Sequence, residues 1–142
     1  MKPSLSAIEQ LRARGHRLTK LRVALIELFA TMEKPISAKA LLARLAKNGL
    51  EVNKTSVYRE LEFLQAQGIV KTVLIGGTQT MYEHTRDHHH HVICRSCETV
   101  EDIHIPVLEQ AVDRSASALK KSTGFSDIEH SLEFFGICHS CR

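Results

Sequence analysis

The sequence predicts an α+β fold in two parts: a helical N-terminal domain that ends in a β-hairpin, and a smaller α/β domain. Apolar residues recur at helical spacing as far as residue 68, and two short runs of strand-forming residues follow. The second half mixes strand and helix patterns and contains all four cysteines and eight of the nine histidines. We therefore expect two domains, 1–82 and 83–142.

Four helices are expected in the first half. The first contains Leu5, Ile8 and Leu11, and Gly15 can end it. Thr19, Ser37 and Asn53 are suitable N-cap residues for the next three, which we expect to end near Pro35, at Asn48–Gly49 and at Gly68. Their predicted buried stripes are Leu21, Leu25, Leu28 and Phe29; Leu41, Leu42 and Leu45; and Val57, Leu61 and Leu64.

The two strands after the fourth helix meet at Gly76–Gly77, which indicates a hairpin. Helices followed by a hairpin have the order of a winged helix-turn-helix, whose later helix enters the major groove of DNA. The start of the fourth helix offers polar side chains that suit phosphates and base edges, namely Lys54, Thr55, Ser56, Tyr58 and Arg59. Residues 1–75 carry 13 Lys and Arg against 6 Asp and Glu, so the first half favours double-stranded DNA as a partner.

The second half is acidic, with 6 Lys and Arg against 10 Asp and Glu in residues 76–142. Residues 91–105 are expected to form strands joined by a tight turn at the first cysteine pair. Pro106 is suited to the first position of a helix that Gly124 ends. Alternation in residues 126–138 predicts a further strand, with Ile128, His130, Leu132 and Phe134 on one face.

The cysteines form two identical C-x-x-C pairs, Cys94 with Cys97 and Cys138 with Cys141. Two such pairs can place four thiolates around one zinc ion, and a shell made only of thiolates indicates a structural site. A small domain with a thin core benefits from such a metal. The alternative is a redox-active or incidental pair, which the doubled spacing disfavours.

Four histidines in series, 88–91, precede the first pair. In an extended segment His89 and His91 face one side while His88 and His90 face the other, so the run can serve two separate metal sites. Imidazole and carboxylate ligands suit zinc, iron, manganese or nickel, and acidic residues lie nearby in the sequence. His130 is either a ligand or a core histidine.

Other classes of protein are less consistent with these features. No apolar run is long enough for a membrane span and no secretion signal is apparent, so we expect a cytoplasmic protein without a membrane partner. No helix-borne H-E-x-x-H pair is present, and we expect neither an enzyme nor a small organic substrate. The alternatives are a thiol oxidoreductase, which needs an accessible reactive thiolate, and a metal-storage protein, which needs no basic half.

Nearly the whole chain resembles the ferric uptake regulator family of metal-dependent transcriptional repressors. The stretches that carry the resemblance are GHRLTKLR, TSVYREL, YEHTRDHHHHVICRSC and EHSLEFFGICHSC. The resemblance implies a winged-helix DNA-binding domain and an α/β dimerisation domain with a structural zinc. It further implies a homodimer that represses metal-homeostasis genes at palindromic operators.

The resemblance also implies specific residue roles. It assigns the structural zinc to Cys94, Cys97, Cys138 and Cys141; a regulatory metal to Glu83, His89, His91 and Asp102; and an additional metal to His88, His90, Glu109 and His130. Tyr58 and Arg59 match the recognition-helix pair of the family, and Arg17 matches its minor-groove residue. With Thr55 and Ser56 these form the expected DNA-binding set.

Two positions bear on the regulatory metal. Iron and peroxide sensors of the family commonly have a histidine just before the third helix, where this chain has Lys34. Zinc sensors commonly have a cysteine near the end of the wing, close to His84, which is a further candidate ligand. The regulatory metal is expected to be zinc or iron(II), with zinc slightly favoured, and manganese and nickel are further options. Glu98 replaces a glycine that the family usually has after the second cysteine of the first pair.

Overall fold

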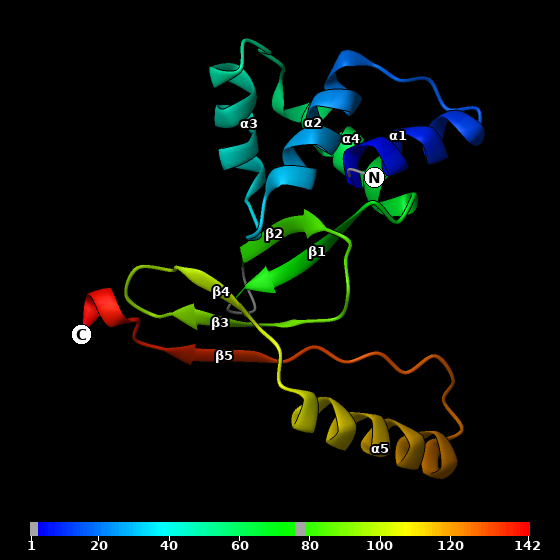
Figure 1. The fold of residues 1–142 in the computed structure, drawn as a ribbon, viewed down its shortest axis with the longest axis vertical. Helices are drawn as coiled ribbons and strands as arrows, with labels where there is room; N and C mark the ends of the chain where they lie inside the picture. The colour runs from blue at the N-terminus through cyan, green and yellow to red at the C-terminus, as the bar shows by residue number, and fades with distance from the viewer. Residues whose placement is uncertain (1–2, 76–78) are drawn as a thin grey trace. The chain divides into compact units, whose positions relative to one another are not determined.

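The computed structural model describes residues 3–75 and 79–142, which belong to two compact units, Met1–Asp87 and His88–Arg142 (Figure 1). Among the described residues, unit 1 contains four helices and a two-stranded sheet, and unit 2 contains a three-stranded sheet and one long helix. The α+β fold class is confirmed. The domain division between residues 82 and 83 stays a prediction, and the expected Gly76–Gly77 turn lies outside the described residues.

The four helices of unit 1 are α1 (Pro3–Ala13), α2 (Lys20–Thr31), α3 (Ala38–Lys47) and α4 (Lys54–Ala66). The expected caps are present: the side chains of Thr19, Ser37 and Asn53 each accept a hydrogen bond from the backbone N–H three residues later. Each bond satisfies one of the N–H groups that a helix start leaves without a partner. Local sequence therefore sets where α2, α3 and α4 begin.

The core of unit 1 lies between these helices. Leu25, Phe29, Leu41, Leu45 and Leu61 are fully or almost fully buried, as their helical spacing predicts. The expected stripe residues that remain partly exposed are Leu21, Leu28 and Leu42. The described core cluster is Ala7, Leu11, Leu25, Ile26, Phe29, Ile36, Ala38, Leu41, Leu45, Val57, Leu61, Leu64, Ile69, Val70 and Tyr82.

The hairpin consists of β1 (Val70–Ile75) and β2 (Gln79–His84), which pair antiparallel from Val70↔His84 to Ile75↔Gln79. The backbone of Tyr82 exchanges two hydrogen bonds of 2.8 Å with Ile36, in the segment before α3. These bonds fix the hairpin against the helices of unit 1. Helices α1–α4 and this hairpin have the order of a winged helix-turn-helix.

Unit 2 is organised around β3 (His90–Cys94), which lies between β4 (Val100–Ile103) and β5 (Glu133–Gly136). β3 and β4 are antiparallel, whereas β3 and β5 are parallel and are connected through α5 (Pro106–Thr123) (Figure 1). Pro106 begins α5, and Gly124 ends it with a left-handed φ of 77°. A short 3₁₀ turn, η1 (His139–Cys141), brings the chain's end beside the start of the β3–β4 turn.

The strand predicted over residues 126–138 is shorter than its alternation indicates. Only Glu133–Gly136 pairs with β3, in the register from His91↔Glu133 to Cys94↔Gly136. Asp127 has a φ of 51°, which breaks an extended conformation at the start of this segment. Ile128, His130 and Leu132 therefore lie in an irregular stretch. None of the described helices is long and apolar enough to cross a membrane.

Candidate metal centres and DNA-binding surface

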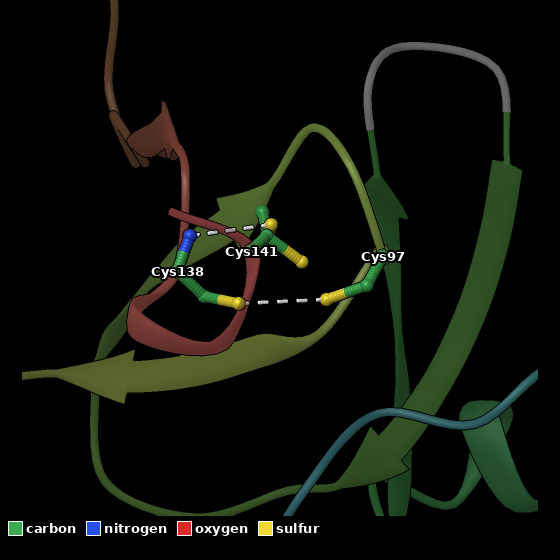
Figure 2. Close-up of side chains that lie close together, drawn as sticks. Cys97, Cys138 and Cys141 are labelled. Atoms are coloured by element: carbon green, nitrogen blue, oxygen red, sulfur yellow. Dashed lines mark hydrogen bonds between the residues drawn. The ribbon is translucent and has the colours of Figure 1, made fainter.

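Four cysteine side chains meet at one end of the unit 2 sheet. Cys94 ends β3, Cys97 lies in the turn to β4, and Cys138 and Cys141 flank the 3₁₀ turn. Figure 2 shows the sulfurs of Cys97, Cys138 and Cys141 directed toward one another. The four sulfur atoms lie within 4.8 Å of one another, so both pairs converge as their spacing predicts.

The sulfur separations suit a metal and not a disulfide. The Sγ atoms of Cys97 and Cys138 are 3.6 Å apart, and all four cysteines are free. Tetrahedral zinc with Zn–S bonds of about 2.3 Å requires sulfurs about 3.8 Å apart, while a disulfide bond is about 2.05 Å long. The donor set therefore fits a structural zinc ion.

The surroundings of the sulfurs lower the pKa of Cys94 and Cys97, which favours their thiolates, and raise the pKa of Cys141. The backbone N–H of Cys138 (Figure 2), followed by that of Cys97, lowers the pKa of Cys94 to about 6. The hydroxyl and backbone of Thr99 lower the pKa of Cys97. A hydrogen bond with Ser96 lowers the pKa of Cys141, but interactions with the other cysteines and burial outweigh it and raise the value to about 12. Four thiolates thus need a cation between them.

The turn between β3 and β4, which carries the first cysteine pair, contains a residue with a strained backbone. Glu98, which follows Cys97, has a φ of 60°, a left-handed conformation that favours glycine. Its N–H donates to the carbonyl of Cys94 over 2.9 Å, closing the turn that carries the first cysteine pair. This geometry gives a physical reason for the glycine that the family usually has at this position.

The histidine run alternates as predicted, and its even members face α5. The Nε2 atoms of His88 and His90 lie 3.3 Å apart, and that of His130 is 2.9 Å from His88. Glu109 of α5 approaches all three: its carboxylate lies 2.5 Å from His90, 3.3 Å from His88 and 3.5 Å from His130. Burial raises the pKa of Glu109, but the hydrogen bond from His90 and the histidine charges lower it by more. These nitrogen and carboxylate donors fit a divalent transition metal.

The odd members of the run face β4. His91 pairs with Asp102 in the β3–β4 register, and its Nε2 lies 3.5 Å from the Oδ1 atom. His89 Nε2 lies 3.9 Å from the same oxygen, and the two imidazole rings are 4.9 Å apart. Unit 2 therefore brings together three of the four residues expected to hold a regulatory metal.

The fourth residue, Glu83, lies near the end of β2 in unit 1. Its Oε1 is 3.1 Å from Nζ of Lys71, the residue opposite it in the hairpin, and its Oε2 is 4.0 Å from Arg86. His84 follows, and burial, then the charge of Arg86, lowers its pKa and favours the neutral imidazole that metals bind.

The expected DNA-binding residues lie at two places in unit 1. Thr55, Tyr58 and Arg59 are exposed on the first turns of α4, and Ser56 is half-buried. The ammonium of Lys54 lies 5.6 Å from the centre of the Tyr58 ring, one helical turn away. Arg17 is exposed in the segment between α1 and α2.

Comparison with known proteins identifies the family. The model of the ferric uptake regulator family matches residues 13–135. The chain belongs to the ferric uptake regulator family. It is 34% identical to a zinc uptake regulation protein of Mycobacterium tuberculosis over 131 residues, which are 92% of this chain and 98% of that protein. It is 30% identical to a ferric uptake regulation protein of Neisseria meningitidis serogroup C over 139 residues, or 96% and 94% of the two chains.

A solved structure of a zinc uptake regulator complexed with zinc and DNA superposes with a TM-score of 0.69. It has 25% sequence identity and covers 97% of this chain and 91% of that one. The fold of a winged helix followed by a dimerisation domain is therefore confirmed. Ferric uptake regulators are transcription regulators, so the expectation that the chain is not an enzyme is confirmed by its family.

The sequence did not indicate several side chains that complete these sites. Thr99 and Ser96 support the thiolates, and Lys71 and Arg86 face Glu83. Only the Lys71 pairing had a signal, because an antiparallel hairpin places residues equidistant from its turn opposite each other. The sequence also did not indicate the ion pair between Arg22 and Glu60 in unit 1, which lie 38 positions apart in the chain.

Proposed function

We propose that this member of the ferric uptake regulator family is a zinc-responsive transcriptional repressor that binds palindromic DNA as a metal-loaded homodimer. The observation that carries the proposal is the separation of three donor sets in unit 2, one of thiolates and two of imidazole and carboxylate groups. A storage protein does not need the basic winged helix, and an oxidoreductase does not need four converging thiolates. The repressor acts in the cytoplasm.

The four cysteines serve as the structural site. They hold the C-terminal turn against the β3–β4 turn and leave no coordination position for a substrate or signal. Bound zinc supplies folding free energy there. The sulfur of Cys94 accepts hydrogen bonds from backbone N–H groups of Cys138 and Cys97, and Thr99 supports the sulfur of Cys97, in the manner of outer-shell partners of metal ligands.

His89, His91 and Asp102 serve as the regulatory ligands of unit 2, and Glu83 is the ligand that unit 1 contributes. Support for the first three is their common face on β3 and β4. Support for Glu83 is its match to the family motif. Because the ligands belong to both units, the metal favours the arrangement of the two units in which it binds more tightly. Coupling between ligand sites is typically about 1–3 kcal/mol, or a 5- to 150-fold change in affinity.

His88, His90, Glu109 and His130 serve as the additional site. Glu109 lies on α5 and His130 precedes β5, so a bound ion joins the long helix to the sheet of unit 2. The helix has no fully buried residue among those described. A metal in this site therefore stabilises the attachment of α5.

Dimerisation through unit 2 is consistent with its exposed apolar surface. Val107 is 77% exposed and Leu119 49% on α5, and Phe134, Phe135 and Ile137 are exposed at and after β5. A small domain that exposes this many large apolar residues needs a partner to cover them. A second copy of the chain provides one, with the symmetry that a palindromic operator requires.

Zinc is favoured as the signal for two reasons. The relative with 34% identity is a zinc uptake regulation protein, while the ferric relative shares 30%. Lys34 stands where iron and peroxide sensors have a histidine. Iron(II), manganese or nickel are the alternatives that the same donor types can bind.

Selection of DNA from a random-sequence duplex library tests the proposal. Protein that retains its cysteine-bound zinc is used with and without added zinc, iron(II) or manganese, each buffered at a defined free concentration. We expect zinc-loaded protein to enrich an inverted repeat and protein without exchangeable metal to enrich none.

Enrichment of the same repeat with and without exchangeable metal would contradict metal control. No enrichment with any of the metals would contradict operator binding.

A further inference from the structure

Arg22, on the first turn of α2, contacts both α4 and the segment that precedes α2. Its backbone N–H donates to the capping hydroxyl of Thr19 over 3.1 Å, while its side chain extends away to α4. The guanidinium binds both carboxylate oxygens of Glu60, the second at 3.2 Å, and the two side chains are each only 13% exposed. This bidentate pair joins α2 to the helix that carries Tyr58 and Arg59.

The same guanidinium makes two further contacts. Its remaining nitrogen donates to the carbonyl oxygen of Arg17 over 2.5 Å. Its central carbon lies 3.6 Å from the centre of the Phe63 ring, one turn along α4 from Glu60. Arginine can do this because its planar group offers donors in several directions while its face stacks on a ring. One side chain therefore holds both α4 and the backbone of the segment that carries Arg17.

Other residues of that segment contact the same face of α4. The ring of His16 meets the Phe63 ring edge-on at 5.0 Å. Arg14 donates to the side-chain oxygen of Gln67 over 3.0 Å. Glu60, Phe63 and the C-cap residue Gln67 are spaced three and four residues apart, so they form one stripe along α4 and its C-terminal end. The segment from Arg14 to Arg17 thus follows this stripe.

We propose that Arg22 is a positioning residue for DNA recognition, which holds the Arg17 segment against α4 so that Arg17 and the recognition helix meet DNA as one surface. The proposal rests on the proposed function, in which Arg17 and α4 contact the same operator. Arg22 also offsets the negative charge of Glu60, which lies next to Arg59 and would otherwise repel phosphates. Because Arg22 is largely covered by these contacts, it acts on DNA through Arg17.

A double-mutant cycle between Arg22→Lys and Arg17→Ala tests this positioning. Lysine keeps the charge but cannot bind Glu60 bidentately, stack on Phe63 and reach the Arg17 carbonyl together. The probe is the duplex that zinc-loaded wild-type protein selects. We expect Arg17→Ala to weaken binding about 10-fold in the wild type. The slope of log affinity against log salt concentration should fall by about 2, or about 1 for each Arg17 of the dimer. In the Arg22→Lys background we expect the same change to weaken binding less than about 3-fold.

The matched control is Arg44→Lys, at an exposed arginine of α3, with which Arg17→Ala should keep its full effect. Glu60→Gln weakens the contact between Arg22 and α4 from the other side and should reduce the effect of Arg17→Ala in the same way. Zinc content and thermal unfolding show whether each variant is folded. An undiminished effect of Arg17→Ala in both the Arg22→Lys and Glu60→Gln backgrounds overturns the proposal, as does a wild type in which Arg17→Ala has no effect. Failure of the wild type to select any duplex overturns the proposed function instead.

Discussion

Replacing Cys138 by serine should destabilise unit 2 and leave unit 1 folded. Among the described residues of unit 2, the buried apolar side chains are those of Ile93, Cys94 and Val100, and α5 adds none. Burial of Ile93 and Val100 stabilises the unit by roughly 3–6 kcal/mol. Zinc binding in small modules provides about 10–16 kcal/mol, so the metal is the larger contribution.

The expected magnitude follows from the loss of one ligand in four. A quarter of that binding free energy is about 2.5–4 kcal/mol, or roughly a 10²- to 10³-fold loss of zinc affinity. Serine retains the backbone N–H that donates to Cys94 Sγ over 3.3 Å, so the substitution removes the thiolate alone. Unit 2 should then lose its metal to a chelator at concentrations that the wild type withstands.

Zinc content and limited proteolysis across a chelator titration provide the assay. We expect Cys138→Ser to lose zinc and to be cleaved within residues 88–142, while residues 1–87 resist because their larger core remains intact. Ser140→Ala, in the same 3₁₀ turn, is the control and should behave as the wild type. A Cys138→Ser variant that holds zinc as tightly as the wild type, or that keeps unit 2 protected without zinc, would show that the cysteine site does not stabilise unit 2.

Three further predictions concern the cysteine turn, the pH and the recognition helix. Glu98→Gly should raise the free energy of unfolding by about 0.5–1 kcal/mol, because glycine removes the left-handed strain, whereas Glu98→Ala should not; thermal unfolding of the zinc-loaded variants distinguishes them. Zinc affinity should fall more steeply below pH 6 than above it, because Cys94, whose pKa is about 6, then binds a proton that zinc must displace. Competition with a chromophoric chelator measures this, and an equal slope on both sides of pH 6 would contradict it. Arg59→Ala should cost about 1–3 kcal/mol of DNA binding without changing zinc content; loss of the folded dimer instead would show a structural role.

The features that the sequence predicted well are those that depend on near neighbours. The N-caps at Thr19, Ser37 and Asn53 each require only a side chain and an N–H three residues away. The opposite faces of the histidine run follow from the period of two in an extended chain. Convergence of the cysteine pairs follows from the tetrahedral requirement of zinc.

The features that the sequence did not predict depend on partners distant in the chain. Residues 126–132 alternate like a strand, but only residues 133–136 pair with β3, and the left-handed φ of Asp127 has no signal in the alternation. The contacts of Arg22 with Glu60 and Phe63 depend on how α2 packs against α4, which no local pattern specifies. The polar groups around Cys94 and Cys97 depend likewise on the path of a turn.

The most direct test of metal control is the DNA affinity of the dimer as a function of free zinc, measured for the wild type, His89→Ala and the control His104→Ala. Each protein must first contain one tightly held zinc per chain, which shows that the cysteine site is intact. We expect zinc to strengthen DNA binding by the wild type and by His104→Ala about 5- to 150-fold, and His89→Ala to lose most of this response. An equal response in all three proteins, or none in the wild type, would contradict a regulatory site on the β3–β4 face.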